Sequence, residues 1–483
     1  MISASTKGND VSSAPAASRE DACMVLARHV AESDYASISE EARTTARRSI
    51  VDSLGVMIGA TGAVPSLDQL VHVIRNIGSA EKGDATVVGF GGTAMPLVAA
   101  FLNGASSHSL DYDDTHETRL CHPSAPLVSA GLACAESIGN VTGQEFIAAI
   151  ALGQDVYCRL AGAAPTGVRK LHGALTWGGI PVAATCSKLL KLDEASTYDA
   201  FAIVGCRSGG PAQLSVSEGS DFRGIYNAFI ARDGLEATLM AKEGIKGISG
   251  LLDGRCGLIA AYFDGVSDRE SLLDGLGEEF PCTEVSYKPW PSCRITHGYI
   301  DAALSILEEN DLVASDVDAI TVYLGDFAST LFEPIDDRMR PKTVLDAKIS
   351  LPFTVGVAVA RGAVRMADFE PEALDNPDVL EMAAKVESTY DSRFDARPAV
   401  GPPSMVEIRT RGGSKISKFV EFAKGHPSNP MTWDDLIGKL REGLGYSAVP
   451  VASTTVDEMV SRAENLDSLS DIGEWLRLAW PHA

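Results

Sequence analysis

The sequence is short of basic residues, which restricts the partners that the protein can bind. Lys and Arg total 41 against 65 Asp and Glu, so the formal net charge is −24. A surface this acidic repels the phosphates of nucleic acids and anionic membranes, so neither is an expected partner. An anionic small molecule could bind only where basic side chains gather in one pocket.

Paired cysteines and long apolar runs are also absent. The nine Cys residues are scattered, without a CxxC pair or zinc-finger spacing. This pattern is typical of a reducing compartment and predicts a cytoplasmic location. No run approaches the roughly 18 apolar residues that suggest a membrane span. Residues 1–21 are rich in Ser and Ala and lack the apolar segment of a secretory signal, so we predict a disordered tail there.

Motifs that bind common cofactors are missing as well. The sequence contains no GxGxxG that follows an expected strand, no Walker motif and no GxSxG elbow. An enzyme interpretation therefore favours acid–base chemistry by side chains alone. We expect no cofactor and no metal.

The sequence pattern changes twice along the chain. Its 483 residues exceed what one hydrophobic core usually covers, which favours two domains. Residues 22–279 carry apolar side chains at helical spacing, residues 280–424 mix helices with alternating segments, and helical patterns return over residues 425–483. The predicted fold class is mainly α. Both ends of the chain form an all-helical domain, and residues 280–424 form an inserted α+β domain.

Individual elements can also be predicted from periodicity and turn residues. We expect the helix that begins at Glu41 to end at Gly59 and Gly62. A glycine turn at Gly412-Gly413 predicts a β-hairpin. The other expected elements are helices over residues 96–110, 124–138, 146–160, 171–190, 296–310 and 351–361, and a strand over 318–324.

The densest group of polar side chains lies between residues 103 and 124. His108, Asp111 and Thr115 are spaced i, i+3 and i+7, so they share one face if the preceding helix continues. Histidine transfers protons near neutral pH, and several carboxylates lie beside it. A metal site formed by His108, Asp111 and His116 is one alternative, although no second metal motif supports it. A polar loop that caps the next helix through Ser124 is another.

Two further groups are candidates for a site. His172 lies in a segment of small residues, where a histidine is more often packed than catalytic. Lys288, Arg294 and His297 lie at the expected domain boundary. They belong either to a proline-rich linker or to a clamp for carboxylates, because clefts between domains are favoured ligand sites.

Six segments are similar to those of one known family. They are NGASSHSLDYDDTHETRLCHPS, ARRSIVDSLGVMIGA, KLHGALTWGGIPVAATCSKLLKL, YKPWPSCRITHGYIDAA, AKISLPFTVGVAVARG and GHPSNPMTWDDL. These segments resemble the MmgE/PrpD family, which includes 2-methylcitrate dehydratase, cis-aconitate decarboxylase and iminodisuccinate epimerase. The resemblance extends from about residue 22 to the C-terminus. It implies a helical domain with an α+β lid, a homodimer and no cofactor.

The resemblance also assigns residues to an active site. It implies catalytic roles for Asp111, Thr115, His122 and His172. The two histidines are the proton-transfer candidates, and the resemblance leaves open which is the acid and which the base. Asp111 and Thr115 would orient the substrate or a histidine. The expected substrate-binding residues are Arg223, Lys288, Arg294, Tyr226 and His297.

The sequence departs from the family pattern at several of these positions. Arg223 stands where the family usually has Lys, and it cannot release its proton as a buried lysine can. Tyr226 and Ala228 replace a His and a Gly. Phe353 stands where the decarboxylase branch has a Tyr, so its hydroxyl is missing.

The function implied is that of a cofactor-independent lyase acting on a small di- or tricarboxylate such as methylcitrate or cis-aconitate. It would be a dehydratase or a decarboxylase that uses histidine-mediated proton transfer, with the carboxylates held by Arg and Lys. One alternative is an isomerase or epimerase of a dicarboxylate such as iminodisuccinate. A non-catalytic relative that only binds is the other.

Overall fold

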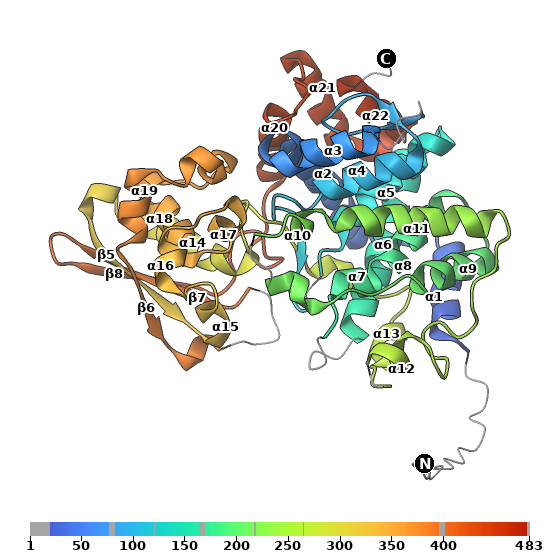
Figure 1. Ribbon diagram of the computed structural model, residues 1–483, viewed down its shortest axis with the longest axis horizontal. Coiled ribbons are helices and arrows are strands. Elements are labelled where there is room, and N and C mark those ends of the chain that lie inside the picture. Colours follow the sequence, from blue (N-terminus) through green and yellow to red (C-terminus); the bar gives the residue numbers. More distant parts are fainter. Residues whose placement is uncertain are drawn as a thin grey trace, which may run out of the picture.

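The computed structural model describes residues 20–76, 83–119, 121–163, 170–216, 219–263, 265–395 and 401–480. Most of the described chain is helical, which confirms the predicted mainly α class. The predicted tail, residues 1–21, lies almost entirely outside the described residues. Figure 1 shows a larger helical lobe and a smaller lobe that contains the main sheet.

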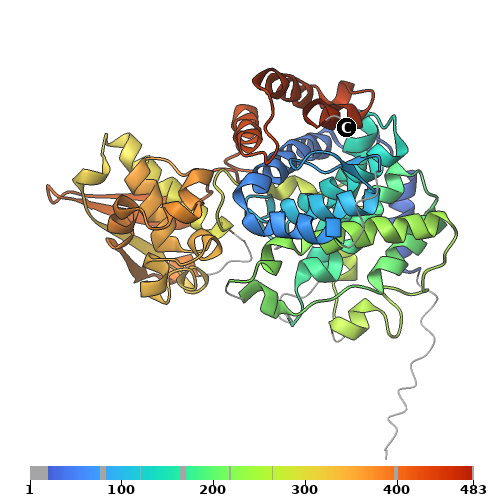
Figure 2. The same ribbon diagram turned by 45° about the horizontal axis from the view of Figure 1, so that its top comes forward.

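The larger lobe is built from helices at both ends of the chain. Its hydrophobic core joins residues between Ala22 and Cys282 with residues between Ile437 and Trp480, and it also includes Met366. In Figure 2 the C-terminal helices lie against the N-terminal ones. The helices are α1 (Ala22–Glu32), α2 (Glu40–Ala63), α3 (Pro65–Asn76), α4 (Pro96–Ser106), α5 (Ser124–Ile138), α6 (Gly143–Ala163), α7 (Gly173–Trp177), α8 (Gly179–Leu189), α9 (Glu194–Gly205), α10 (Phe222–Ile225), α11 (Asn227–Lys242), α12 (Leu258–Tyr262), α13 (Arg269–Leu273), α20 (Trp433–Gly445), α21 (Ser453–Glu464) and α22 (Ile472–Ala479).

The smaller lobe has its own hydrophobic core, formed by residues between Trp290 and Val420. Its sheet has the strand order β6-β5-β7-β8, with β5 and β6 parallel and the other pairs antiparallel. Helix α14 packs on β7, on β8 and on α18. The elements are α14 (His297–Glu309), β5 (Val317–Leu324), α15 (Asp326–Ser329), α16 (Ile335–Met339), α17 (Val344–Lys348), α18 (Leu351–Arg361), α19 (Pro377–Ala383), β6 (Val386–Tyr390), β7 (Ser404–Thr410) and β8 (Lys415–Val420).

Two short ribbons connect loops within the structure. Strand β1 (Ala85–Thr86) pairs with β2 (Thr93–Ala94), and β3 (Thr115–His116) pairs with β4 (Val285–Ser286). The second ribbon joins the polar cluster of residues 103–124 to the chain that enters the smaller lobe. It therefore fixes the position of the candidate site relative to Lys288.

The predicted end of the second helix is wrong. Helix α2 continues through Gly59 and Gly62 to Ala63. These glycines allow α20 to approach closely: a Cβ at Gly59 would lie 3.2 Å from the Cα of Gly443, and one at Gly62 would lie 2.0 Å from the carbonyl oxygen of Tyr446. Close helix packing, rather than a turn, explains why glycine is present here.

Two other helix predictions also need correction. Residues 171–190 form two helices, α7 and α8, with a break at Gly178. Helix α4 ends at Ser106, so His108, Asp111 and Thr115 do not share a helical face. Asp111 instead has a positive φ of 51° and lies in a tight turn.

No single helix among the described residues is long and apolar enough to cross a membrane. Helices α2 and α3 together satisfy the length and composition criteria, but they are bent by 89° at the break between them.

Candidate active site

One pocket of about 370 Å³ contains most of the predicted site residues. Its lining includes His122, His172, Asp111 and Thr115, the four predicted catalytic residues. Asp111, Thr115 and His122 come from the connection between α4 and α5, and His172 directly precedes α7; Leu345 of the smaller lobe also contributes. The predicted substrate-binding residues that line the pocket are Arg223, Lys288, Arg294 and Tyr226.

Three buried lysines hold the turn that carries Asp111. The ammonium groups of Lys348, Lys288 and Lys439 donate to the consecutive carbonyl oxygens of Leu110, Asp111 and Tyr112, at 2.6, 3.0 and 2.6 Å respectively. Each lysine is at least 96 % buried. They come from α17, from the segment after β4 and from α20, so both lobes and the C-terminal helices position this turn.

Lys288 is also paired with the Asp111 side chain. Its Nζ lies 2.5 Å from Oδ1 of Asp111. Burial opposes ionisation of this carboxyl, but the charges of Lys288, His108 and Arg223 outweigh burial and hold the pKa of Asp111 well below its usual range. Asp111 therefore remains a carboxylate, and it offsets the charge that Lys288 would offer to a substrate.

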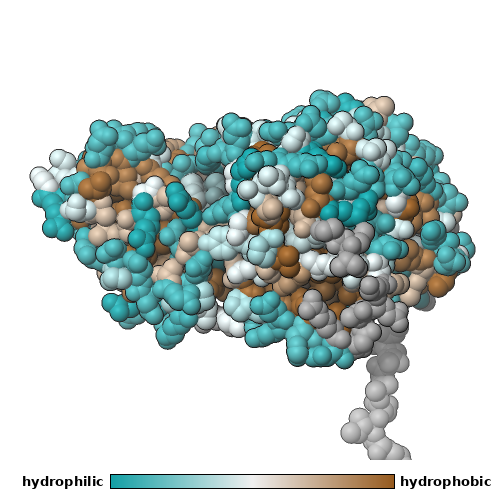
Figure 3. Space-filling view, turned by 90° about the horizontal axis from the view of Figure 1, so that it is seen from above, coloured by the Kyte–Doolittle hydropathy of each residue, from teal (hydrophilic) through white to brown (hydrophobic). Residues whose placement is uncertain are grey.

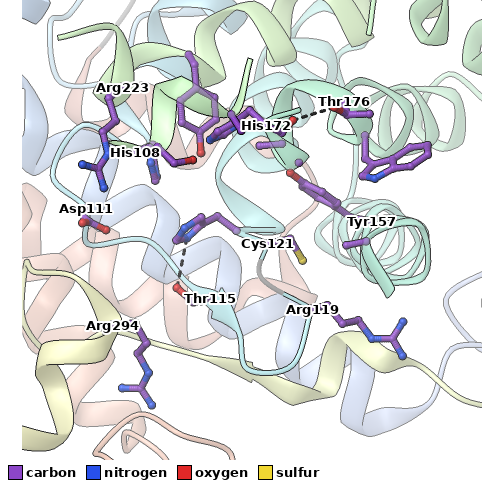
Figure 4. Close-up of a pocket in the computed structure, with 18 of the residues that line it drawn as sticks. His108, Asp111, Thr115, Arg119, Cys121, Tyr157, His172, Thr176, Arg223 and Arg294 are labelled. Atoms are coloured by element: carbon purple, nitrogen blue, oxygen red, sulfur yellow. Dashed lines mark hydrogen bonds between the residues drawn. The ribbon is translucent and has the colours of Figure 1, made fainter. Parts of the chain in front are cut away.

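His122 is oriented by its Nδ1 atom. This nitrogen lies 2.7 Å from the carbonyl oxygen of Asp114. It also lies 3.3 Å from Oγ1 of Thr115, and a dashed line at Thr115 marks this contact in Figure 4. A carbonyl oxygen only accepts, so Nδ1 carries the proton and the neutral ring keeps its lone pair on Nε2. A neutral imidazole with a free Nε2 is suited to act as a base.

Asp113 connects His122 to a second histidine. Its carboxylate accepts from Nδ1 of His108, at 2.9 Å to each oxygen, and lies 3.4 Å from Nδ1 of His122. The His108 and His122 rings are 4.9 Å apart between centroids. Burial disfavours the charge of Asp113, but the two histidines lower its pKa to about 2. The sequence indicated His108 only as a member of the polar cluster and gave Asp113 no role, because their pairing depends on the turn after α4.

The three groups of this network are also close enough to surround a cation. Their ligand atoms lie within 4.8 Å of one another. In the hydrogen-bonded arrangement, however, both Nδ1 atoms carry protons and offer no lone pair to a metal. The alternative set of His108, Asp111 and His116 does not converge, since Nε2 of His116 bonds the carbonyl oxygen of Pro281 at 2.9 Å and Asp111 pairs with Lys288.

His172 lies on the other side of Tyr226 from His108. Each of the two histidine rings is 4.9 Å from the Tyr226 ring between centroids. Nδ1 of His172 is buried and has no hydrogen-bond partner among the described residues. Burial lowers the pKa of His172 to about 4, with further contributions from His108, His122 and Arg223. Burial likewise lowers the pKa of His122 to about 4, although Asp113 opposes that shift.

The arginines of the pocket differ in how far their charges are neutralised. Arg223 makes no ion pair with any residue that the structure describes, and Figure 4 shows it beside Asp111. Arg294 is bound to Glu117, with Nη2 at 2.9 Å and Nε at 3.1 Å from Oε1. Its charge is therefore already balanced within the protein, and its substrate-binding role stays a prediction. Arg119 lines the pocket, was not predicted, and donates to the carbonyl oxygen of Cys158 at 2.8 Å.

His297 is the predicted site residue that does not reach the pocket. It is fully buried at the start of α14, and its Nε2 lies 3.2 Å from the carbonyl oxygen of Ser292. Its ring packs 5.2 Å from that of Trp290, measured between centroids. Phe353 is also fully buried, in the core of the smaller lobe, where it contacts Phe369. Neither side chain is placed to bind a ligand in this pocket.

Comparisons with known proteins agree with the sequence resemblance. The MmgE/PrpD N-terminal domain matches residues 24–270, and the MmgE/PrpD C-terminal domain matches residues 290–464. A cis-aconitate decarboxylase-like protein of Aspergillus oryzae is 28% identical, with 94% of this chain and 96% of that protein aligned. The cis-aconitate decarboxylase of Mus musculus is 24% identical over 89% of this chain and 88% of its own length. That of Aspergillus terreus is 25% identical over 82% and 84%. The chain therefore belongs to the MmgE/PrpD family.

Proposed function

We propose that the protein is a cofactor-independent lyase that dehydrates or decarboxylates a small di- or tricarboxylate such as methylcitrate or cis-aconitate. The observation that carries the proposal is a pocket in which two histidines of lowered pKa lie beside an arginine that has no ionic partner among the described residues. Several relatives are named as cis-aconitate decarboxylases, which supports the lyase class.

The chemistry follows from the charges of the pocket. Arg223 binds one substrate carboxylate, and Lys288 contributes a further donor. In a dehydration, one neutral histidine takes the proton from the carbon beside a carboxylate, and the other, protonated, delivers its proton to the departing hydroxyl. In a decarboxylation, the bond to the carboxylate breaks, CO2 leaves, and a protonated histidine supplies the proton to the carbon. Substrate carboxylates favour the protonated histidine that both routes require.

The test is to incubate the purified protein with cis-aconitate, methylcitrate and iminodisuccinate and to identify the products by NMR. Loss of water or CO2 supports the lyase. Inversion of iminodisuccinate without loss of a group supports the epimerase alternative. Binding of these acids without turnover supports the non-catalytic relative and contradicts the proposal.

We further propose that the smaller lobe is a lid over the pocket, over residues 280–424, and that the protein is a cytoplasmic homodimer. Leu345 in the pocket lining and the contact of Lys348 with Leu110 support the lid.

Exposed hydrophobic areas, visible on both lobes in Figure 3, support an interface with a second copy. Light scattering with a concentration series tests the dimer.

Replacing Arg223 by lysine is expected to raise KM by about tenfold or more with a smaller change in kcat. An arginine binds a carboxylate through two parallel hydrogen bonds, which a lysine cannot reproduce. Steady-state kinetics with the substrate identified above provide the measurement. Arg232 to lysine is the matched control, because that arginine is already paired with Asp233. An unchanged KM for the Arg223 variant would remove the clamp from the proposal.

Activity is expected to persist to lower pH than an ordinary histidine allows. The pKa values of His122 and His172 are about 4 rather than 6.5. Since kcat/KM reports the ionisation of the free enzyme, the acid limb set by the histidine that acts as the base should lie near pH 4. The unfolded histidines take up protons below about pH 6.5 and the folded ones only near pH 4, so the free energy of unfolding should fall across that window. Both quantities can be measured from pH 4 to 8, and an acid limb at pH 6.5 contradicts the lowered pKa values.

A further inference from the structure

Tyr157 places a buried hydroxyl in the pocket without a partner. The residue lies in α6 and is 1% exposed, and it lines the pocket. Its hydroxyl oxygen is buried and makes no hydrogen bond with any described residue. Most buried polar groups in proteins are hydrogen-bonded, and leaving one unpaired costs stability. A buried, unpaired hydroxyl that lines a pocket therefore suggests a missing ligand.

The backbone around Tyr157 is rigidly held. Two residues earlier, Asp155 is bound by Arg159, with Nε at 2.9 Å from Oδ1. Arg159 also donates to carbonyl oxygens of the segment after α13, including those of Asp274 and Glu279 at 2.7 Å each. The backbone that carries the tyrosine is therefore held in place before a ligand binds.

The hydroxyl is a donor rather than a base. Burial raises the pKa of Tyr157 well above its ordinary value, and the neighbouring thiol of Cys121 and the Tyr226 hydroxyl add to the effect. In Figure 4 Tyr157 lies on the opposite side of the pocket from Arg223 and Asp111, with its hydroxyl directed inward. Arg119, which makes no ion pair with a described residue, lies on the same side as Tyr157. This side of the pocket thus offers a neutral donor near a free cation.

We propose that the Tyr157 hydroxyl is a substrate-binding donor, which holds a carboxylate of the substrate on the side of the pocket opposite Arg223. The proposal rests on the proposed function, because it requires a substrate with at least two carboxylates. Arg223 binds one of them and Tyr157 the other. The substrate then extends across the pocket past His122 and His172. A monocarboxylate of similar size could occupy only one of the two positions.

Replacing Tyr157 by phenylalanine tests the proposal, since the change removes only the hydroxyl and keeps the ring. The affinity for tricarballylate, measured by calorimetry, should fall by about 10- to 100-fold, as expected for a lost hydrogen bond to a charged group. The unfolding temperature should stay the same or rise, because the free protein loses an unpaired buried group. This combination of weaker binding and undiminished stability distinguishes a ligand contact from a structural one.

Tyr299 to phenylalanine is the matched control. Its ring is equally buried, but its hydroxyl donates to the carbonyl oxygen of Tyr323 at 2.9 Å. This variant should lose stability and bind tricarballylate as the unmodified protein does. If the Tyr157 variant binds normally, or if its unfolding temperature falls as that of the Tyr299 variant does, the proposal is wrong while the proposed function stands. If the unmodified protein binds neither tricarballylate nor citrate, the polycarboxylate function fails, and this proposal fails with it.

Discussion

Replacing His122 by alanine is expected to lower kcat by about 10²- to 10⁴-fold, the usual contribution of a positioned acid or base. The side chain lines the pocket, and its Nδ1 proton is directed to the carbonyl oxygen of Asp114. The alanine variant lacks Nε2, the atom whose lone pair would accept the substrate's proton. The ring is a quarter exposed, so its removal should change the unfolding temperature little.

His72 to alanine is the control for this variant. That histidine is exposed in α3 and bonds Asn76 on the surface. Turnover of the identified substrate and thermal unfolding should both be measured for the two variants. Near-normal turnover in the His122 variant would show that the histidine is not the proton-transfer group.

Replacing Lys439 by methionine is expected to lower the free energy of unfolding by about 3–5 kcal/mol, because it leaves an unpaired carboxylate in the core. Lys439 lies 2.7 Å from Oδ1 of Asp52, and both side chains are buried. The other oxygen of Asp52 already lacks a partner among the described residues. Burial raises the pKa of Asp52, although Lys439 opposes this, so removing the lysine should raise it further. Chemical denaturation provides the measurement.

A surface pair supplies the comparison for Lys439. Lys424 lies 2.8 Å from Asp435, but both side chains are partly exposed. Its replacement by methionine should cost less than about 1 kcal/mol. Replacing Asp52 by asparagine together with Lys439 by methionine should recover part of the loss, since the unpaired charge is then absent while the carbonyl oxygen of Tyr112 stays without its lysine donor. If the double variant is no more stable than the single one, the buried charge is not the cause.

Local patterns in the sequence predicted much of the fold. The limits of α5 and α18 agree with the expected ranges, and the hairpin of β7 and β8 turns at the glycines that indicated it, with Gly413 at φ 86°. These elements are set by hydrophobic period and turn residues close to one another in the chain. The extent of α2 was not predictable in this way, because its glycines pack against α20, far away in the sequence.

The candidate site was predicted only in part for the same reason. The resemblance supplied His122, His172 and Arg223, which do line one pocket. It could not show that Arg294 is neutralised by Glu117, since the residues are 177 positions apart. The unpaired hydroxyl of Tyr157 likewise has no signature in sequence, because tyrosine within an apolar helix usually indicates core packing. Such features depend on which polar groups remain unpaired after the chain has folded.

The lysines that hold the turn at residues 110–112 have a consequence for how the protein is made. Lys288, Lys348 and Lys439 follow their carbonyl partners at Asp111, Leu110 and Tyr112 by 177, 238 and 327 residues. A ribosome that adds 5–20 residues per second needs roughly 15–65 s to cover the longest of these separations. During that time a nascent chain can form the early helices but not the anchored turn. The pocket is therefore expected to be among the last parts to assemble, because an incomplete chain lacks lysines that anchor this turn.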